Sequence, residues 1–286
     1  MRSVAYLFAV GCAMILGLEA GAPAAPKPGA VIPLARAHAH NDYLHPRPLL
    51  DALDAGFTSV EADIWLVDGE LLVAHDRRET GPERTLRALY LDPLQRIIRA
   101  RGGRVYRAYP YPVVLLVDIK SDAEETYRVL DAQLRAYTSM LTAASASGVR
   151  PGAVLVVVSG NRPREIMLGQ PVRYASYDGR LTDLGGPLPS SIMPVVSDNW
   201  TGHFAWMGIG PMPEGEPGKL SAIVARAHAR RQRVRFWATP DAGGGAEAVW
   251  SELLRAGTDY ISTDQLVALR EFILRTDPSP SQPFVR

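Results

Sequence analysis

The chain has 286 residues, of which 47% are hydrophobic and 21% charged, the proportions of an ordinary globular protein. Its 31 basic and 30 acidic residues give a net charge of +1, and no long run of one sign occurs. This balance argues against a nucleic-acid-binding surface. The length fits one large domain or two small ones, so the pattern of predicted elements has to decide between them.

Residues 1–25 have the order of a secretory signal peptide, because Arg2 is followed by a short apolar stretch and then by small residues. We expect an exported protein, periplasmic or secreted, with residues 26–34 as a linker. A retained N-terminal anchor is one alternative, and a lipoprotein anchor at Cys12 is a weaker one. Cys12 is the only cysteine, so a mature chain without it has neither a disulfide nor a cysteine nucleophile.

Beyond this segment, short runs rich in Val, Ile and Leu alternate with helical patterns. The apolar runs occupy residues 31–40, 58–67, 71–76, 113–120, 153–160, 172–178, 192–200, 234–241 and 259–265. Helical patterns occupy residues 47–56, 123–145, 218–232 and 245–257. The second and third runs flank Asp68-Gly69, which predicts a hairpin.

Near-continuous apolar strands that alternate with helices indicate a parallel sheet covered on both faces. Eight such units over about 250 residues match a single closed (β/α)8 barrel. An open doubly wound sheet is the alternative, but it usually has fewer strands, and no glycine-rich phosphate loop follows the first strand. We therefore predict an α/β fold, a single-domain TIM barrel over residues 35–275 with a C-terminal tail at 276–286.

Polar residues follow most of the predicted strands, and the active sites of barrels form at these carboxyl ends. Glu61 and Asp63 lie two apart in an apolar strand, so both side chains point to one face. Two acids there repel each other and lose hydration unless a positive group lies between them. With Asp118 they make three carboxylates, which suit a hard divalent cation, Mg²⁺ with Ca²⁺ as the alternative.

His40 and His75 end two of the strands, and an imidazole exchanges protons near neutral pH. We predict these two residues as the catalytic acid and base. Lys120 points the same way as Asp118 and is predicted to hold an anionic oxygen of the substrate. His38 shares a face with His40 but is expected deeper, as a packed core residue. This set fits phosphodiester cleavage, in which one imidazole activates the attacking hydroxyl and the other protonates the departing alkoxide.

Further substrate contacts are predicted from Asn41, Asp198, Asn199 and Trp237, all near strand ends. A long loop with two tryptophans follows Asn199, and such loops over a barrel mouth are usually functional or disordered. Trp206 in this loop either touches lipid or fastens the loop to the body of the protein. We expect a small-molecule or lipid phosphodiester as the substrate, no nucleic acid, and transient contact with a membrane surface.

These motifs resemble the phospholipase-C-like phosphodiesterase superfamily, which includes glycerophosphodiester phosphodiesterases and sphingomyelinase-D-type enzymes. In this resemblance HNDY at 40–43 and AHD at 74–76 hold the catalytic histidines, EAD at 61–63 holds the metal pair, and DIK at 118–120 holds a later ligand and the lysine. The similarity extends over residues 35–267. AHAHNDY together with SDNW is most similar to the branch related to the altered-inheritance-of-mitochondria-6 proteins.

The resemblance implies a metal-dependent phosphoric diester hydrolase of lipid metabolism, acting on a glycerophosphodiester or a (lyso)phospholipid-type substrate. Asn41-Asp42 stand where glycerophosphodiesterases have Arg-Gly, so the headgroup stays open, as does the oligomeric state. The nucleophile is either water or the substrate's own hydroxyl, which gives a cyclic phosphate. Two alternatives are an inactive barrel that binds anionic phosphate esters and a glycoside hydrolase that uses Glu61 with Asp63 or Asp118.

Overall fold

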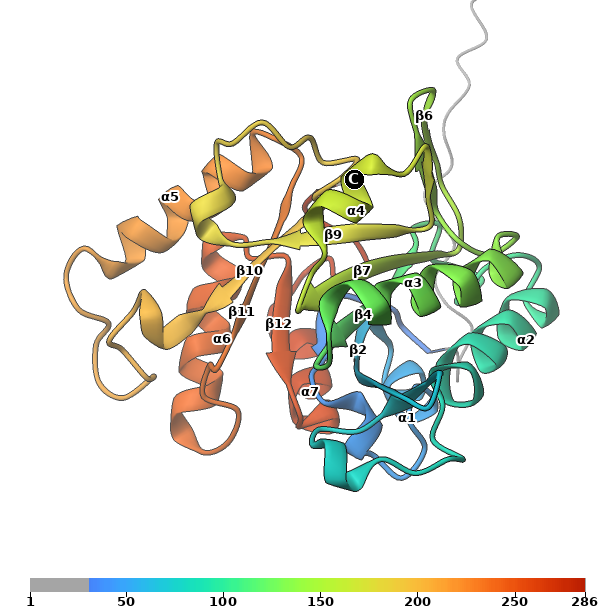
Figure 1. Cartoon of the computed structure of the whole chain (residues 1–286). Helices are drawn as coiled ribbons and strands as arrows, with labels where there is room; N and C mark the ends of the chain where they lie inside the picture. Colours follow the sequence, from blue (N-terminus) through green and yellow to red (C-terminus); the bar gives the residue numbers. More distant parts are fainter. Residues whose placement is uncertain (1–30, 286) are drawn as a thin grey trace, which may run out of the picture. The chain divides into compact units, whose positions relative to one another are not determined.

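A ring of eight parallel strands forms the centre of the protein (Figure 1). The structure is a computed structural model, and it describes residues 31–285. The predicted signal peptide at 1–25, with Cys12, and most of the predicted linker at 26–34 lie outside the described residues.

The strands of the ring pair in parallel in the order in which they follow along the chain, and the last strand pairs with the first. They are β1 (Leu34–Ala39), β2 (Phe57–Val67), β4 (Val113–Ile119), β7 (Val154–Gly160), β9 (Ala175–Gly179), β10 (Val195–Asn199), β11 (Arg233–Trp237) and β12 (Tyr260–Thr263). Because the ring closes between β12 and β1, the predicted TIM barrel is confirmed.

Strand β2 continues beyond the ring and forms an antiparallel hairpin with β3 (Glu70–Val73). The turn between them is Asp68-Gly69, with φ angles of 51° and 83°. Positive φ at both positions defines the mirror-image turn that matches the twist of the two strands, and Asp-Gly is a preferred pair for it. The hairpin lies where the sequence predicts it.

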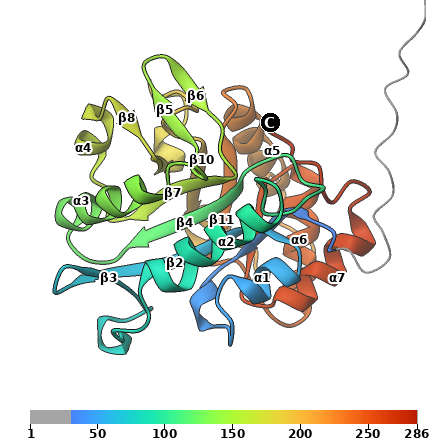
Figure 2. The ribbon, with the colours of Figure 1, turned by 90° about the vertical axis from the view of Figure 1, so that its right-hand side faces the viewer.

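Helices connect most of the strands and cover the outside of the ring (Figures 1 and 2). They are α1 (Leu50–Asp54), α2 (Asp92–Ala100), α3 (Ala123–Leu134), α4 (Arg164–Gly169), α5 (Glu216–His228), α6 (Gly244–Ala256) and α7 (Leu266–Thr276). Short helical turns are η1 (Asp42–Leu44), η2 (Arg77–Glu79), η3 (Arg87–Leu91), η4 (Arg135–Tyr137), η5 (Leu181–Asp183) and η6 (Trp200–Gly202). Only the turn η5 stands between β9 and β10, so this unit lacks the full helix that an ideal barrel has.

A small antiparallel sheet at the side of the barrel is not predicted from the sequence. It contains β5 (Ala143–Ser145), β6 (Gly148–Arg150) and β8 (Val172–Arg173), in the order β6-β5-β8. The helical pattern at 123–145 includes β5, but α3 ends at Leu134. Leu141 instead bridges Val154 in parallel and is fully buried, so pairing with the barrel outweighs the local helical pattern.

Alternation along the strands separates an apolar barrel interior from a polar mouth. On β4, Val114 and Leu116 belong to a buried cluster, and Asp118 follows on the same face at the carboxyl end. The remaining core fills the space between strands and helices. Among residues 31–285, no helix has the length and apolarity needed to cross a membrane.

Candidate active site

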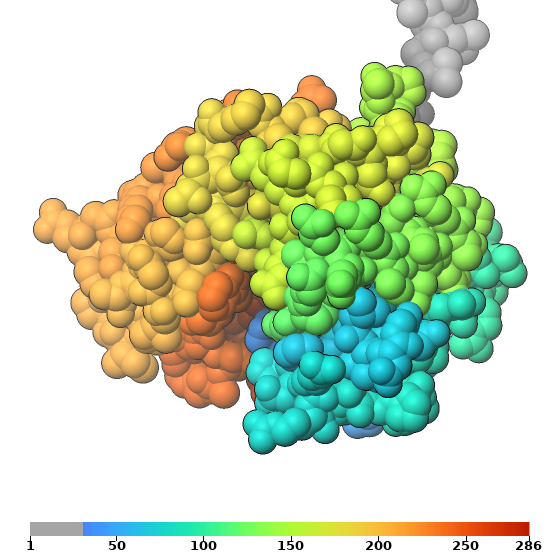
Figure 3. Space-filling model, viewed as in Figure 1, coloured from blue at the N-terminus to red at the C-terminus, as the bar shows by residue number. Residues whose placement is uncertain are grey.

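A cavity of about 420 Å³ opens at the carboxyl ends of the barrel strands. Figure 3 shows a hollow on this face, where early (blue), middle (green) and late (orange) parts of the chain meet. Eight of the predicted site residues line the cavity: His40, Asn41, Glu61, Asp63, His75, Asp118, Lys120 and Trp237. The volume suits a small molecule or a headgroup.

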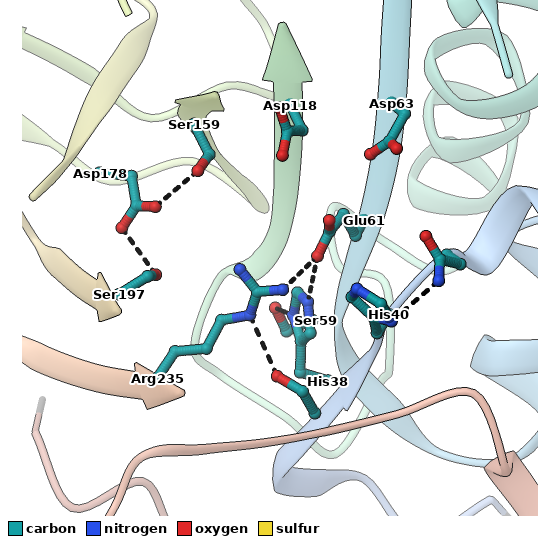
Figure 4. Close-up of polar contacts among 12 residues, drawn as sticks. His38, His40, Ser59, Glu61, Asp63, Asp118, Ser159, Asp178, Ser197 and Arg235 are labelled. Carbon is teal, nitrogen blue, oxygen red and sulfur yellow. Dashed lines mark hydrogen bonds and ion pairs between the residues drawn. The ribbon is translucent and has the colours of Figure 1, made fainter. Parts of the chain in front are cut away.

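Three carboxylates converge in this cavity, as Figure 4 shows. One oxygen each of Glu61, Asp63 and Asp118 lies within 4.8 Å of the others. The sheet register explains the arrangement, because Asp63 on β2 is the direct partner of Asp118 on β4, and Glu61 precedes Asp63 on the same face. The structure therefore brings together the three residues that the sequence suggests as metal ligands.

The donor set fits a divalent cation. The Lys120 ammonium lies 3.1 Å from Oδ2 of Asp63 and 3.2 Å from Oδ2 of Asp118. The second oxygen of each aspartate, Oδ1, is buried and has no hydrogen-bond partner among the described residues. Two unpartnered carboxylate oxygens beside a third carboxylate provide the hard oxygen ligands that Mg²⁺ and Ca²⁺ require.

Glu61 is held in place by two buried side chains (Figure 4). Its Oε2 accepts hydrogen bonds from the Arg235 guanidinium and from Nε2 of His38. Burial alone raises the pKa of a carboxyl group, but the charge of Arg235 and the His38 hydrogen bond outweigh it, so the pKa of Glu61 falls well below its usual range. Glu61 is therefore an ionised ligand candidate with a fixed orientation.

His38 lies below the cavity and is fully buried. Its Nδ1 is 2.7 Å from the Ser59 hydroxyl, and burial together with the nearby Arg235 lowers its pKa to about 3. A neutral imidazole donates from Nε2 to Glu61 and accepts from Ser59 at Nδ1. His38 thus orients Glu61 and does not reach the substrate cavity.

The pKa values of Asp63 and Asp118 shift in the opposite direction from that of Glu61. Burial, together with the charge of Glu61, raises the pKa of Asp63. Burial, opposed by Lys120 but reinforced by Glu61 and Asp63, raises the pKa of Asp118 to about 6. Both pKa shifts express burial first and then the crowding of negative charge, which Lys120 only partly relieves, and a cation between the carboxylates would oppose them.

Both histidines of the cavity are anchored through Nδ1. Nδ1 of His40 lies 2.8 Å from Oδ1 of Asp264, and Nδ1 of His75 lies 3.3 Å from the Tyr43 hydroxyl and 3.4 Å from Oδ2 of Asp63. Neither Nε2 atom has a hydrogen-bond partner among residues 31–285. Anchoring one ring nitrogen fixes the tautomer and leaves the other free for proton transfer. Burial lowers the pKa of His40, but the Asp264 hydrogen bond and the charge of Glu61 outweigh burial and raise it.

Several residues of the site are not found by the sequence reasoning. The Tyr43 hydroxyl contacts Asn41, Asp63 and His75, and Tyr43 stands in the HNDY motif without a predicted role. Arg235 lies two residues before Trp237, so the period of two along a strand was an available signal for it. Asp264 lies just after the last strand, a position shared by other site residues.

A second polar cluster forms the other side of the cavity. Asp178 is fully buried and accepts hydrogen bonds from Ser159 at 2.7 Å, Ser197 at 2.8 Å and Arg180 at 3.0 Å (Figure 4 shows the two serine contacts). Arg180 and Ser159 also line the cavity. Because Asp178 is fully paired, it serves to hold Arg180 at the wall, where a guanidinium favours an anionic ligand.

Asp198 and Asn199 are not among the residues that line the cavity. Asp198 accepts a hydrogen bond from the Leu181 amide at 3.0 Å, and Asn199 accepts one from the Thr201 amide at 2.9 Å. The Asp198 carboxylate thus fastens the turn η5, which precedes β10, and the Asn199 amide oxygen fastens the loop that follows β10. Trp206 in that loop is buried and donates to backbone carbonyls, so it holds the loop to the body of the protein rather than facing solvent.

A closed barrel with a carboxylate cluster and two anchored histidines at the carboxyl ends of its strands has the layout of a barrel enzyme. Residues 29–178 match the AIM6-like phosphodiesterase domain, and residues 233–266 match the glycerophosphoryl diester phosphodiesterase family. The chain belongs to the family of AIM6-like phosphodiesterase domains, which confirms the resemblance seen in the motifs.

Two similar fungal proteins carry the name from which AIM6 is abbreviated. Altered inheritance of mitochondria protein 6 of Eremothecium gossypii is 32% identical over 84% of this chain and 69% of its own. The homolog of Arthroderma benhamiae is 27% identical over 82% of each chain. A glycerophosphoryl diester phosphodiesterase from Parabacteroides distasonis, a solved structure, aligns over 87% of this chain and 88% of its own with 14% identity and a TM-score of 0.49.

The prediction of an exported protein with a signal peptide is contradicted by these relatives. They are named for the inheritance of mitochondria and not for export. The prediction rested on one basic residue before a short apolar stretch, in residues outside the described part of the chain. More than one kind of N-terminal targeting segment combines basic and apolar residues, so this pattern alone does not define a destination.

Proposed function

We propose that the protein is a metal-dependent phosphoric diester hydrolase that uses His40 and His75 for acid–base catalysis. The observation that carries the proposal is the arrangement of two anchored imidazoles around three carboxylates that line one cavity, two of which have an oxygen without a partner among the described residues. The family match adds support, because it names a phosphodiesterase domain.

Glu61, Asp63 and Asp118 would hold the cation, Mg²⁺ with Ca²⁺ as the alternative. When bound, the cation supplies positive charge that offsets the charge of the phosphate and the charge that develops on it. Lys120 and Arg180 line the same cavity and add fixed positive charge around the non-bridging oxygens.

The histidines move the protons. One Nε2 accepts the proton of the attacking hydroxyl, and the other donates a proton to the departing alkoxide oxygen. Asp264 keeps the His40 ring oriented, and Tyr43 does the same for His75. The attacking hydroxyl belongs either to water or to the substrate, and the second case yields a cyclic phosphate.

The substrate is a glycerophosphodiester or a (lyso)phospholipid-type phosphodiester. Half-buried Trp237 at the end of β11 lines the cavity and would contact the alcohol portion. Asn41 also lines it and stands next to His40. The volume of about 420 Å³ accommodates a headgroup and its phosphate.

The test is hydrolysis of bis-p-nitrophenyl phosphate, glycerophosphodiesters and lysophospholipids by the full chain, with and without EDTA. We expect EDTA to abolish activity and Mg²⁺ to restore it. His75→Ala should lower kcat by about 10²-fold or more while metal binding, measured by calorimetry, persists. His203→Ala is the matched control, because His203 pairs with Asp198 outside the cavity.

Each alternative gives a different result. An inactive binding barrel shows no turnover in the wild type, and a carboxylate-based glycosidase cleaves sugars even when His75 is replaced. Full activity in EDTA, or equal activity of His75→Ala and His203→Ala, would falsify the proposal. Phosphorus NMR of the products separates the two nucleophiles, because only attack by a substrate hydroxyl produces a cyclic phosphate.

A further inference from the structure

A second cavity, of about 500 Å³, lies at the opposite end of the barrel from the candidate active site. Its barrel residues come from the amino ends of strands: Leu155 of β7, Ser176 of β9 and Arg233 of β11. The small sheet β6-β5-β8 (labelled in Figure 2) and Val285 complete the wall. The volume falls within the range of sites for small molecules.

The lining of this cavity carries positive charge only. Arg173, Arg231 and Arg233 contribute guanidinium groups, and the described residues that line it include no Asp or Glu. Arg233 is already engaged, since it donates to the Val285 carbonyl at 3.2 Å and lies 3.5 Å from the Tyr260 hydroxyl. The side chains of Arg173 and Arg231 form no hydrogen bond or ion pair with any residue from 31 to 285.

Arg173 is the most informative residue of the cavity. The residue is only 8% exposed, yet its guanidinium has no partner among the described residues. None of its nitrogens is among the fully buried atoms that lack a hydrogen-bond partner, so the guanidinium opens into the cavity, where an anion can replace the hydration that the surrounding residues remove. The guanidinium fork is suited to a planar or tetrahedral anion.

Hydroxyl groups and apolar surface surround the two free arginines. Ser176, Ser190 and Ser191 line the cavity, and none uses its side chain in a hydrogen bond within the described residues. Apolar side chains form the rest of the wall, among them Pro110, Pro112, Pro151, Val149 and Leu155. A ligand that satisfies both parts of the wall has an anionic group and an apolar body.

We propose that this cavity is a binding site for a small organic anion, separate from the candidate active site. Arg173 and Arg231 hold its carboxylate or phosphate, the serine hydroxyls donate to the same group, and the apolar body packs against the prolines. The proposal does not depend on phosphodiesterase activity, since no residue of the first cavity takes part in it.

The test uses benzoate as the probe, with benzyl alcohol as its neutral counterpart, in calorimetric titrations of the full chain. We expect wild type to bind benzoate and not benzyl alcohol, and Arg173→Met and Arg231→Gln each to weaken benzoate binding by about tenfold. Arg99→Gln is the control, because Arg99 is an exposed arginine of α2 that lines neither cavity. Inorganic phosphate is then titrated as a competitor. If phosphate displaces benzoate, the natural ligand carries a phosphate group, and if benzoate stays bound, the natural ligand carries a carboxylate. Either result supports an anion site.

Thermal unfolding gives an independent readout. Without added anion, Arg173→Met should melt no lower than wild type, because it removes a partly dehydrated charge that has no partner among residues 31–285. Added benzoate should raise the melting temperature of wild type and Arg99→Gln but not that of Arg173→Met. The proposal is overturned if benzoate fails to bind wild type, if benzyl alcohol binds as well as benzoate, or if Arg231→Gln binds benzoate like Arg99→Gln. Phosphodiester hydrolysis should be unchanged in Arg173→Met and Arg231→Gln.

Discussion

Arg235 is a buried residue whose charge determines the state of Glu61. Its side chain is 4% exposed, with one nitrogen donating to Ser262 at 3.1 Å and another to Glu61. Removing one partner of a buried ion pair leaves the other charge unpaired in a medium of low dielectric constant. Arg235 is therefore a positioning residue, which keeps Glu61 ionised and oriented for a cation.

Arg235→Gln should lower the free energy of unfolding by about 3 kcal/mol, measured by urea denaturation, because it leaves Glu61 as an unpaired buried carboxylate. The double variant Glu61→Gln/Arg235→Gln should regain most of this loss, since neither charge remains. Arg128→Gln removes an exposed arginine that pairs with Glu124 at 3.3 Å, and this control should cost less than about 1 kcal/mol. A stability change for Arg235→Gln as small as that of Arg128→Gln would show that the buried pair does not hold Glu61.

The ends of strands β4 and β7 approach each other so closely that only glycine fits at position 160. Gly160 is the register partner of Ile119 and has a φ of +66°. An added Cβ would overlap Oδ1 of Asp118 and would lie 2.5 Å from the Ile119 carbonyl oxygen. The glycine thus leaves room for the carboxylate oxygen that has no partner among the described residues.

Gly160→Ala should weaken metal binding by about tenfold or more, because the methyl group displaces the Asp118 carboxylate and the backbone conformation is strained for alanine. Calorimetric titration with Mg²⁺ measures the change. Gly169→Ala in α4 is the control, since an added Cβ there meets no atom within 4 Å. If Gly160→Ala binds Mg²⁺ as tightly as Gly169→Ala, Asp118 does not contribute its inner oxygen to the site.

The elements also show which parts of the site the sequence can reveal. Alternation along one strand was enough to place Glu61 and Asp63 on a common face. The contact between Glu61 and Arg235 joins strands that are distant in sequence and do not pair with each other. No local sequence pattern therefore predicts this contact. The substrate contact of Asp198 remains a prediction, because a polar residue at a strand end can equally hold a neighbouring loop, as the Asp198 carboxylate does when it accepts from the Leu181 amide of η5.

At the scale of the whole molecule, the C-terminal segment secures the amino end of the barrel. Arg36 of β1 forms a 2.5 Å ion pair with Asp277, donates to the Ser279 carbonyl at 3.2 Å and stacks 3.9 Å from the centre of the Phe284 ring. These contacts join the end of the chain to the first strand. Through these contacts the C-terminal segment contributes to the stability of the whole barrel.

Asp118 links that stability to pH. Its pKa in the folded protein is raised to about 6 by burial and by Glu61 and Asp63, so the folded state binds a proton more tightly than the unfolded chain. Its contribution to stability is therefore present at low pH and is lost as the pH rises through about 6.

In EDTA, the free energy of unfolding of wild type relative to Asp118→Asn should fall by on the order of 2 kcal/mol between about pH 4 and pH 8. Excess Mg²⁺ should reverse this slope in wild type only, because the cation binds the ionised carboxylate and its affinity grows as protons leave. Urea denaturation of both proteins at several pH values, with and without Mg²⁺, measures the effect. Parallel curves in EDTA would mean that burial and the neighbouring carboxylates do not raise the pKa of Asp118.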